Sequence, residues 1–398
     1  MRALVTGSTG LLGNNLVRTL IDAGHEVWAL ARSKEKAQRE VGDTAARVVL
    51  GDIRNVANFA YELRGIDVIF HAAAYFREYY NPGDHSNAIE LTNVKGTMEL
   101  AQAAHAMGVR RMIYTGSASI IGLQPNGSPG DEQMLPWPGA AKNLYLDSKR
   151  RTEEWLREFS REKRFFIASA LPSWMWGPHD VAPTPSGQLV LDAIAHKLPP
   201  MVPPGGSAVV DARDVATSML RMAEIGRSGE RYILSGSFVE LGDLFANLAA
   251  LTAATAPTRS IPFAVALALA IGAETWSRIT HTVSPISVEA IRLMNARLHV
   301  TSAKAEKQLG AAFRPLRATL ADTVLWAQTR VQRKSGRSAP ALSVSKQETV
   351  CLCRRGFFVT ITEFEERAAG RTLCRLERQN RPSRNSPSFA VALNCGME

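Results

Sequence analysis

The sequence predicts an α/β fold with a doubly wound parallel sheet, because short apolar segments alternate with helix-like segments over residues 1–171. The segments expected to form strands are mainly apolar, which indicates a sheet covered by helices on both faces. A glycine-rich turn directly follows the first of these strands. Together these three observations predict the fold class.

The elements of this sheet can be placed in chain order. Strands are expected at Arg2–Val5, Glu26–Ala31, Val48–Leu50, Val68–Phe70, Arg111–Tyr114 and Phe165–Ala170. Helices are expected at Leu11–Ala23, Ala88–Met107 and about Tyr145–Phe159. Residues 1–171 are therefore predicted to form one domain.

The composition changes after residue 171. Proline and glycine are dense from Pro172 to Gly206, which predicts a loop-rich insertion. Helices are expected at Val215–Ile225 and Glu240–Leu251. Residues 172–330 are predicted to form a smaller substrate-binding lobe over the edge of the sheet, interwoven with the first domain.

The last segment, residues 331–398, differs in charge and in cysteine content. The chain has a net charge of +10, and more than half of this charge lies in the last segment. All four cysteines also lie there, at a spacing that does not fit a zinc site, so no metal site is expected. Helical periodicity is lost, and one strand is expected at Phe357–Ile361. This segment is predicted to be a poorly ordered basic tail. Its positive charge alone would support nucleic-acid binding as an alternative, but it lacks the interleaved aromatic residues of a stacking platform, so no nucleic acid is expected.

Composition excludes several classes of protein. Apolar residues make up 45% and charged residues 21% of the chain, which is typical of a globular protein. The longest apolar run, Ile261–Ala273, is shorter than the about 20 residues of a membrane span, so no integral membrane segment is expected. Its part Phe263–Ile271 is predicted to be a packed helix, with peripheral membrane contact as the alternative. A cytoplasmic location is predicted, since no signal peptide is recognisable and residues 1–330 contain no cysteine.

The glycine-rich turn indicates a dinucleotide site of the Rossmann type. Gly7 permits a tight turn, Gly10 lets the backbone approach a pyrophosphate, and Gly13 allows close helix packing. The start of the following helix offers unpaired N–H groups to phosphates. Contacts are expected from Gly7, Thr9, Gly10, Leu11, Leu12 and Gly13.

The end of the second strand indicates which dinucleotide binds. No Asp or Glu follows Ala31, where an acid would hold the ribose 2′-hydroxyl of NAD. Arg32 stands there instead, with Lys36 one helical turn further on, and a guanidinium group pairs with a 2′-phosphate. NADP(H) is therefore predicted over NAD(H). Asp52, followed by Ile53, is expected beside the adenine, with simple helix capping as the alternative.

A second group of residues indicates proton transfer. Tyr145 and Lys149 are four positions apart and share one face of the expected helix. A phenol titrates near 10, and an ammonium group beside it lowers its pKa, which makes proton transfer feasible near neutral pH. Ser117 follows the fifth strand, at the sheet edge where ligands bind.

These motifs resemble the extended short-chain dehydrogenases/reductases, the NAD-dependent epimerase/dehydratase family, over about residues 1–330. The resemblance is carried by the glycine turn, Gly51-Asp52, His71-Ala72-Ala73-Ala74, Asn93, Ser117, Tyr145-x-x-x-Lys149 and Arg213-Asp214-Val215-Ala216. It implies that Tyr145 transfers the proton, that Lys149 binds the nicotinamide ribose, and that Ser117 binds the substrate oxygen. It implies a largely structural Asn93 and a homodimer through paired helices. Cofactor contacts are also implied at Ala72, Ala73, Ala74, Tyr145, Lys149 and Pro172.

Within this family the chain is most similar to dihydroflavonol-reductase-like members. Nucleotide-sugar epimerases tend to have an acidic ribose ligand, and they carry an arginine where this chain has Ser207. The expected pocket has aromatic residues that suit a flat or apolar substrate, although core packing would explain each of them equally well. They are Tyr75, Phe76, Trp137, Trp174 and Trp176. Asp131 and Glu132 are expected to be a solvated loop pair, with substrate contact as the alternative.

The sequence thus predicts an oxidoreductase that moves a hydride between NADP(H) and a carbonyl or secondary alcohol on a small, partly apolar molecule. The alternative is a sugar epimerase or dehydratase that keeps its cofactor bound. A cofactor-sensing regulator without catalysis is a further alternative, which the presence of both Tyr145 and Lys149 disfavours.

Overall fold

The chain divides into two units, residues 1–335 and 336–398. The computed structural model describes residues 1–76, 84–280, 287–334, 349–353, 357–367, 371–378 and 391–394. In the second unit the described residues form an antiparallel sheet of β13 (Thr349–Cys353), β14 (Phe357–Arg367), β15 (Arg371–Arg378) and β16 (Val391–Asn394). The strand expected at Phe357–Ile361 begins β14, and the other three strands were not predicted. The tail was predicted to be poorly ordered over residues 331–398. Residues 331–334 end a helix, and the residues of the tail outside this helix and the four strands lie outside the described ones.

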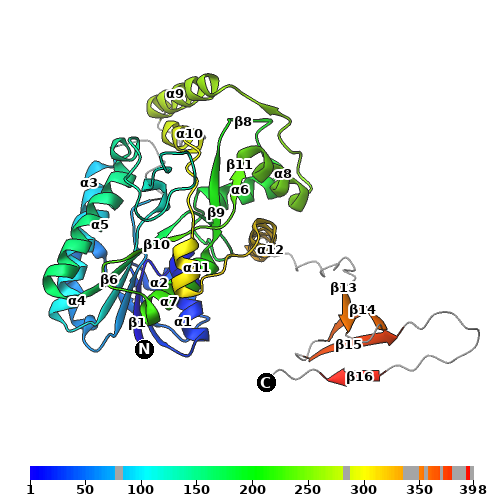
Figure 1. Cartoon of the computed structure of the whole chain (residues 1–398), viewed down its shortest axis with the longest axis horizontal. Helices are drawn as coiled ribbons and strands as arrows, with labels where there is room; N and C mark the ends of the chain where they lie inside the picture. Colours follow the sequence, from blue (N-terminus) through cyan, green and yellow to red (C-terminus); the bar gives the residue numbers. More distant parts are fainter. Residues whose placement is uncertain are drawn as a thin grey trace, which may run out of the picture. The chain divides into compact units, whose positions relative to one another are not determined.

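The first unit is built on a parallel sheet with the strand order β10-β6-β5-β4-β1-β2-β3 (Figure 1). Its strands are β1 (Arg2–Thr6), β2 (Glu26–Ala31), β3 (Arg47–Leu50), β4 (Val68–His71), β5 (Arg111–Thr115), β6 (Phe166–Pro172) and β10 (Arg231–Leu234). The first six confirm the expected strands, and β10 was not predicted. Strand order reverses between β1 and β4, which is where open α/β sheets bind ligands.

Helices cover both faces of this sheet, which confirms the doubly wound arrangement. One face packs in a common core against α1 (Leu11–Asp22), α2 (Lys34–Val41), α7 (Ala212–Ile225) and α11 (Ala303–Leu309). The other face packs against η1 (Ile53–Asn58), η2 (Ala60–Leu63), α4 (Gly96–Ala106) and α5 (Leu144–Lys163). Both cores consist mainly of aliphatic side chains, as expected for a sheet buried on two sides.

The helix expected at Ala88–Met107 has three consecutive parts. It begins as α3 (Ser86–Ile89), continues as the π-helical turn η4 (Glu90–Lys95), and ends as α4. Such π turns are rare and frequently lie at functional sites. This one carries Asn93, which is buried.

A smaller layer follows β6 in the chain. The strands β7 (Trp174–Trp176), β9 (Gly206–Asp211) and β11 (Phe238–Glu240) form a second sheet. The helices α6 (Pro185–Ile194), α8 (Leu241–Thr252) and α12 (Leu316–Lys334) share a core with these strands. The helix expected at Glu240–Leu251 is therefore confirmed as α8, whereas α12 was not predicted.

The prediction of a loop-rich insertion from Pro172 to Gly206 was wrong in part. This segment contains β7, α6 and β8 (Met201–Val202). Pro185 is at the start of α6, where its missing N–H group is not needed, and the Thr184 side chain caps the helix by accepting from the Gly187 N–H group. A proline that starts a helix looks like a loop signal in the sequence.

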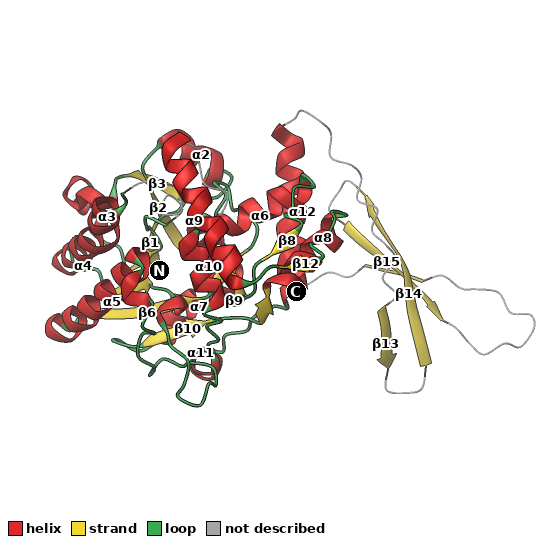
Figure 2. Cartoon of the chain, turned by 90° about the horizontal axis from the view of Figure 1, so that it is seen from above, coloured by secondary structure: helices red, strands yellow, loops and turns green. Residues whose placement is uncertain are grey.

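Two further helices lie at the upper end of the first unit in Figure 1 and are seen side by side in the view from above (Figure 2). They are α9 (Phe263–Thr280) and α10 (Val288–Asn295), which share a small core made by Ala266, Ala270, Val288 and Ile291. Nearby, β12 (Arg259–Ser260) pairs with β8. The packed helix predicted at Phe263–Ile271 is the first half of α9, although Leu269 in it is 51% exposed. Among the described residues, no helix has the length and apolar character needed to cross a membrane.

Candidate active site

The turn between β1 and α1 is shaped by two glycines. Gly7 has a φ of +67°, and a Cβ atom there would lie 2.8 Å from backbone atoms of Ala72 and Ala73. A Cβ atom at Gly13 would collide with the carbonyl oxygen of Gly7. Only glycine at both positions allows the turn to lie against the residues that follow β4 while α1 packs on the turn.

The start of α1 is suited to phosphate groups. Gly10 is the N-cap residue, is exposed, and offers no side chain to the amide groups of the first helical turn. These amides carry the positive end of the helix dipole. The fold thus provides the backbone cradle that a dinucleotide pyrophosphate requires, and no side chain of a described residue caps this helix start by a hydrogen bond.

The residues expected at the adenosine end lie next to this cradle. Arg32 is exposed directly after β2, and Asp52 follows β3. The Asp52 carboxylate accepts hydrogen bonds from the Arg54 backbone N–H at 2.9 Å and from Arg54 Nη2 at 2.6 Å. The Arg54 side chain holds the pKa of Asp52 below its usual value. Asp52 therefore caps η1, which was the alternative to an adenine contact, and Ile53 behind it is buried.

Lys149 joins α5 to the carboxyl end of β5. Its Nζ donates a hydrogen bond to the carbonyl oxygen of Thr115 at 2.7 Å and lies 5.8 Å from the centroid of the Tyr145 ring. Asn143 caps α5 by accepting from the Leu146 N–H group, so Tyr145 and Lys149 lie in the first two turns of the helix. The predicted face of the helix is thereby directed at the end of β5.

Ser117 lies two residues beyond Thr115. Its Oγ accepts a hydrogen bond from the Ser119 N–H group at 3.3 Å and caps η5 (Ala118–Ile120). The helix α5 contacts η5, and Tyr145 packs against the apolar cluster that contains Ala118. The two hydroxyl-bearing residues and the lysine therefore lie around the same strand end.

The surroundings of Lys149 are poor in compensating charge. The side chain is buried, and its Nζ lies 5.0 Å from the centroid of the Tyr114 ring. Burial lowers the pKa of Lys149 to about 7, although the charge of Glu153 opposes this shift. A lysine with this pKa can exchange a proton near neutral pH.

A chain of hydrogen bonds links the glycine turn to the π turn. Ala73 N–H donates to Thr6 Oγ1, which lies 2.7 Å from Nδ1 of His71. On the other side of the imidazole, Nε2 lies 2.8 Å from Thr97 Oγ1, whose proton goes to the carbonyl oxygen of Asn93. Because Thr97 must then accept, the hydrogen bonds assign the ring proton to Nε2. Burial lowers the pKa of His71 to about 3, so the imidazole is neutral.

Asn93 connects the residues after β4 to α5. Its Oδ1 accepts from the Tyr75 N–H group at 2.7 Å, and its Nδ2 donates to the Tyr75 carbonyl oxygen and to Ser148 Oγ. Ser148 is the neighbour of Lys149 in the chain. The expected structural role of Asn93 is consistent with these contacts.

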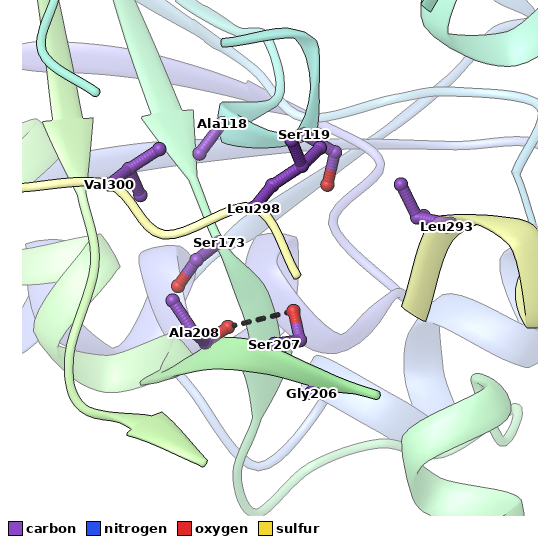
Figure 3. A pocket seen from close by; sticks show the side chains of 9 residues that line it. All are labelled: Ala118, Ser119, Ser173, Gly206, Ser207, Ala208, Leu293, Leu298 and Val300. Atoms are coloured by element: carbon purple, nitrogen blue, oxygen red, sulfur yellow. Dashed lines mark hydrogen bonds between the residues drawn. The ribbon is translucent and has the colours of Figure 1, made fainter. Parts of the chain in front are cut away.

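Two cavities adjoin this strand end. The first is a pocket with three serines and several apolar residues, which Figure 3 shows. Its lining residues are Ala118, Ser119, Ser173, Gly206, Ser207, Ala208, Leu293, Leu298 and Val300. The second, of about 370 Å³, lies between the start of α5 and α10, and Leu293 lines both.

The aromatic residues expected near the substrate differ in their surroundings. The Phe76 ring lies 4.9 Å from the Tyr145 ring, and the Tyr75 hydroxyl lies 2.9 Å from Nδ1 of His85. The indole of Trp137 donates to the Ser119 carbonyl oxygen and lines the larger cavity.

The two tryptophans of β7 are part of the core of the smaller layer. Trp176 is 1% exposed, Trp174 packs against the same core, and their rings lie 5.1 Å apart. This placement agrees with core packing, which was the alternative to substrate contact.

The expectation for Glu132 was wrong. Its Oε1 accepts a hydrogen bond from the Ile233 N–H group of the edge strand β10 at 2.8 Å, and burial raises its pKa. Glu132 therefore fixes its loop to the sheet, whereas Asp131 caps the following turn by accepting from Gln133 N–H.

The remaining predicted cofactor residues lie along the carboxyl edge of the sheet or at the start of α1. Ala72, Ala73 and Ala74 follow β4, and Pro172 ends β6. Thr9, Leu11 and Leu12 belong to the glycine turn and to the first turn of α1, and Lys36 lies in the first turn of α2.

Some residues of this site and of its hydrogen bonds were not identified from the sequence. The Thr115 carbonyl, the partners Thr6 and Thr97 of His71, and Leu293 on α10 belong to this group. A backbone acceptor leaves no residue-type signal. Leu293 is far along the chain from the other lining residues. The spacing of Asn93 and Thr97, at i and i+4 on a helix, was the one local sign available.

The fold and this site together define a dinucleotide-dependent α/β enzyme. The chain belongs to the NAD dependent epimerase/dehydratase family, whose sequence model matches residues 3–235. It is accordingly an oxidoreductase of the extended short-chain dehydrogenase/reductase type, as predicted.

Several known proteins are similar to this chain. A protein named putative dihydroflavonol 4-reductase from Synechocystis is 27% identical over 81% of this chain and 94% of its own length. Sterol demethylase protein B from Methylococcus capsulatus is 30% identical over 83% of this chain and 99% of its own length. The crystal structure of a dTDP-glucose 4,6-dehydratase from Streptomyces venezuelae with NAD bound has a TM-score of 0.67 at 22% identity, and covers 84% of this chain and 98% of its own. Because the identity to this structure is only 22%, the similarity shows a shared fold and nothing about the substrate.

Proposed function

We propose that this protein uses NADP(H) to reduce a carbonyl group, or to oxidise a secondary alcohol, on a small and partly apolar molecule. The observation that carries the proposal is the hydrogen bond from Lys149 to Thr115, because it directs the face of α5 that bears Tyr145 towards the strand end that bears Ser117. In this proposal residues 1–171 bind the dinucleotide and residues 172–330 bind the substrate.

The proposed chemistry assigns one task to each residue. The bound dinucleotide supplies the hydride for reduction. Tyr145 donates its phenolic proton to the substrate oxygen, while Ser117 donates a hydrogen bond to that oxygen and polarises the carbonyl group. Lys149 holds the nicotinamide ribose and stabilises the phenolate that remains on Tyr145.

The substrate class is supported by the lining of the smaller pocket. Ser207, which stands where nucleotide-sugar epimerases carry an arginine, lines it together with Leu293 and Val300. This pocket of about 20 Å³ has no cation in its lining, which does not favour a substrate diphosphate there, whereas the larger cavity is lined by Lys142 and Arg292. Similarity to proteins named for dihydroflavonol reduction and sterol demethylation also supports a substrate with an apolar ring system.

The preference for NADP(H) is tested by titration with NADPH and NADH, followed by nicotinamide fluorescence. Tighter NADPH binding is expected, because the exposed Arg32 after β2 can pair with the 2′-phosphate. Arg32→Asp should reverse the preference, whereas Arg64→Asp, which changes an exposed arginine elsewhere, should not. Equal or tighter binding of NADH by the unchanged protein would overturn the assignment.

The family to which the chain belongs also contains epimerases and dehydratases. Purified protein that carries tightly bound NAD(H), and that converts a sugar nucleotide without net oxidation, would establish that second function. For the reductase, steady NADPH consumption with a ketone is expected.

We further propose a cytoplasmic location and a homodimer without nucleic acid. The absence of cysteine from residues 1–330 supports a reducing compartment. The family resemblance supports pairing through helices that include α5. Sedimentation of the purified protein at low and high salt, with and without DNA, tests both statements about partners.

A further inference from the structure

The helix α9 exposes a broad apolar face. Val265 is 46%, Leu269 51%, Trp276 66% and Ile279 68% exposed. Together with Gly272 these residues follow each other at steps of four and three, which places them along one side of the helix. Ala264, Ala268 and Ile271 widen the exposed face, and these flanking positions carry no charged side chain.

Among the described residues, apolar packing covers only the opposite side of α9. Ala266 and Ala270 are buried against Val288 and Ile291 of α10, and this small core is separate from the larger cores of the first unit. A helix that is apolar on all sides is normally buried on all sides. A continuous exposed apolar face of this kind marks an interaction surface.

The charges around α9 and α10 are mainly positive. Residues 258–298 contain four arginines and two glutamates. Both glutamates are engaged within the protein, since Glu274 accepts from the Val288 N–H group and Glu289 accepts from Asn143 Nδ2. Arg259 on β12 and Arg292 on α10 are exposed. Arg297 is paired with Glu240, whereas Arg259 and Arg292 leave an excess of positive charge on β12 and α10, which suits an anionic partner.

A second helix is a poor match for this face. Helices that pair along such a seam carry charged residues beside the apolar stripe, and these charges select the partner. Here the flanking positions Ala268, Ile271 and Thr275 are uncharged, and Arg278 near the end of the helix continues this series with a single charge. A wide apolar face with an exposed tryptophan and adjacent arginines instead matches helices that lie in the interface of a membrane.

We propose that α9 and α10 dock on an anionic lipid surface, with α9 lying flat and Leu269, Trp276 and Ile279 inserted among the acyl chains. The protein would attach to one leaflet and would not span it, in agreement with the absence of a spanning helix among the described residues. The arginines would pair with lipid phosphates, so that attachment depends on both apolar contact and charge.

Docking at this place would bring the larger cavity close to lipid. That cavity of about 370 Å³ is lined by Arg292 and Leu293 of α10, and Leu293 also lines the serine-containing pocket near Ser117. An apolar substrate dissolved in the membrane would reach the catalytic strand end past α10. This delivery step rests on the proposed function, whereas the docking itself does not.

The test is sedimentation of the full chain with vesicles of phosphatidylcholine alone and of phosphatidylcholine mixed with phosphatidylglycerol. Binding is expected to the anionic vesicles and to decrease with salt. The double variant Leu269→Glu, Trp276→Glu should reduce binding by about tenfold or more, since it removes two inserted side chains and adds negative charge. Leu135→Glu, at a leucine 82% exposed elsewhere, should bind like the unchanged protein.

A second measurement reports on the depth of insertion. The emission of Trp276, obtained as the difference between the unchanged protein and Trp276→Phe, should shift to shorter wavelength when anionic vesicles are added. NADPH binding by each variant, measured without vesicles, shows that the variant is folded and that docking and cofactor binding are separate.

Two outcomes would overturn the proposal. One is absence of sedimentation with anionic vesicles while NADPH still binds. The other is a homodimer that Leu269→Glu dissociates, which would make a second copy of the chain the occupant of this face. If the unchanged protein binds anionic vesicles but reduces no carbonyl substrate, this result would contradict the proposed function and would leave the docking proposal standing.

Discussion

The ammonium group of Lys149 lies 2.7 Å from the carbonyl oxygen of Thr115 and is buried there. This hydrogen bond connects α5 with the end of β5. It uses one of the three N–H donors of the ammonium group, and the rings of Tyr114 and Tyr145 lie near the nitrogen. Burial at this place lowers the pKa of Lys149, so the stability of the folded protein depends on pH.

The stability of the cofactor-free protein should rise with pH above neutral because of Lys149. Burial lowers the folded-state pKa to about 7 from the ordinary 10.5. Between these values the unfolded chain binds more protons than the folded protein, so raising the pH favours folding, and the contribution is constant below about pH 7. Lys149→Met should remove this rise, which amounts to about 2 kcal/mol between about pH 7 and about pH 9.

Urea unfolding at the two pH values measures this effect. Lys163→Met, which changes an exposed lysine in the last turn of the same helix, is the matched control and should leave the pH dependence unchanged. The same pH dependence in Lys149→Met and in the unchanged protein would show that Lys149 is not the group responsible.

Tyr145→Phe should remove most of the catalytic activity while the protein still binds its cofactor. Phenylalanine retains the ring that packs against Phe76 but has no proton to transfer. A loss of about 10²- to 10⁴-fold in kcat is expected. Tyr61→Phe, which removes the hydroxyl of a tyrosine 64% exposed on η2, should retain full activity. Wild-type kcat in Tyr145→Phe would exclude Tyr145 as the proton donor.

The sequence was informative where chemistry depends on residue type at fixed spacing. The glycines of the first turn and the pair Tyr145 and Lys149 could be singled out because each has a local pattern, and the first six strands could be placed because they are mainly apolar. Such patterns report on one element at a time.

What could not be predicted depends on contacts between distant segments. Glu132 resembles any polar loop residue until β10 is seen to present its N–H group to it. Pro185 resembles a loop residue because the cap formed by Thr184 is a local geometry rather than a composition. Leu293 reaches the pocket from a helix that lies far along the chain from the other lining residues. Tertiary contact decides each of these cases.

Thr97→Val should destabilise the protein through His71. The Thr97 hydroxyl is the acceptor for the Nε2 proton of the buried imidazole, and valine has the same shape but cannot accept. A buried donor without a partner costs about 1–3 kcal/mol in the free energy of unfolding. Chemical denaturation measures the change.

Thr323→Val is the control for this substitution. Thr323 is also buried in a helix and also donates to the carbonyl four residues earlier, but no described side chain donates to it. A change within about 1 kcal/mol is expected. If both variants lose the same free energy, the hydrogen bond to His71 contributes nothing specific.

Removal of residues 336–398 should leave the activity and the unfolding transition of the first unit intact. The chain divides after Ser335, and α12 ends just before this point at Lys334. Truncation after Pro315 should behave differently, because α12 contributes the buried Leu320, Val324 and Ala327 to the core of the smaller layer. Loss of this helix should cost of the order of 5 kcal/mol or more, which is comparable to the stability of a whole domain. Thermal unfolding and NADPH oxidation of both truncated proteins measure the two effects, and loss of activity in the shorter deletion would show that residues 336–398 take part in function.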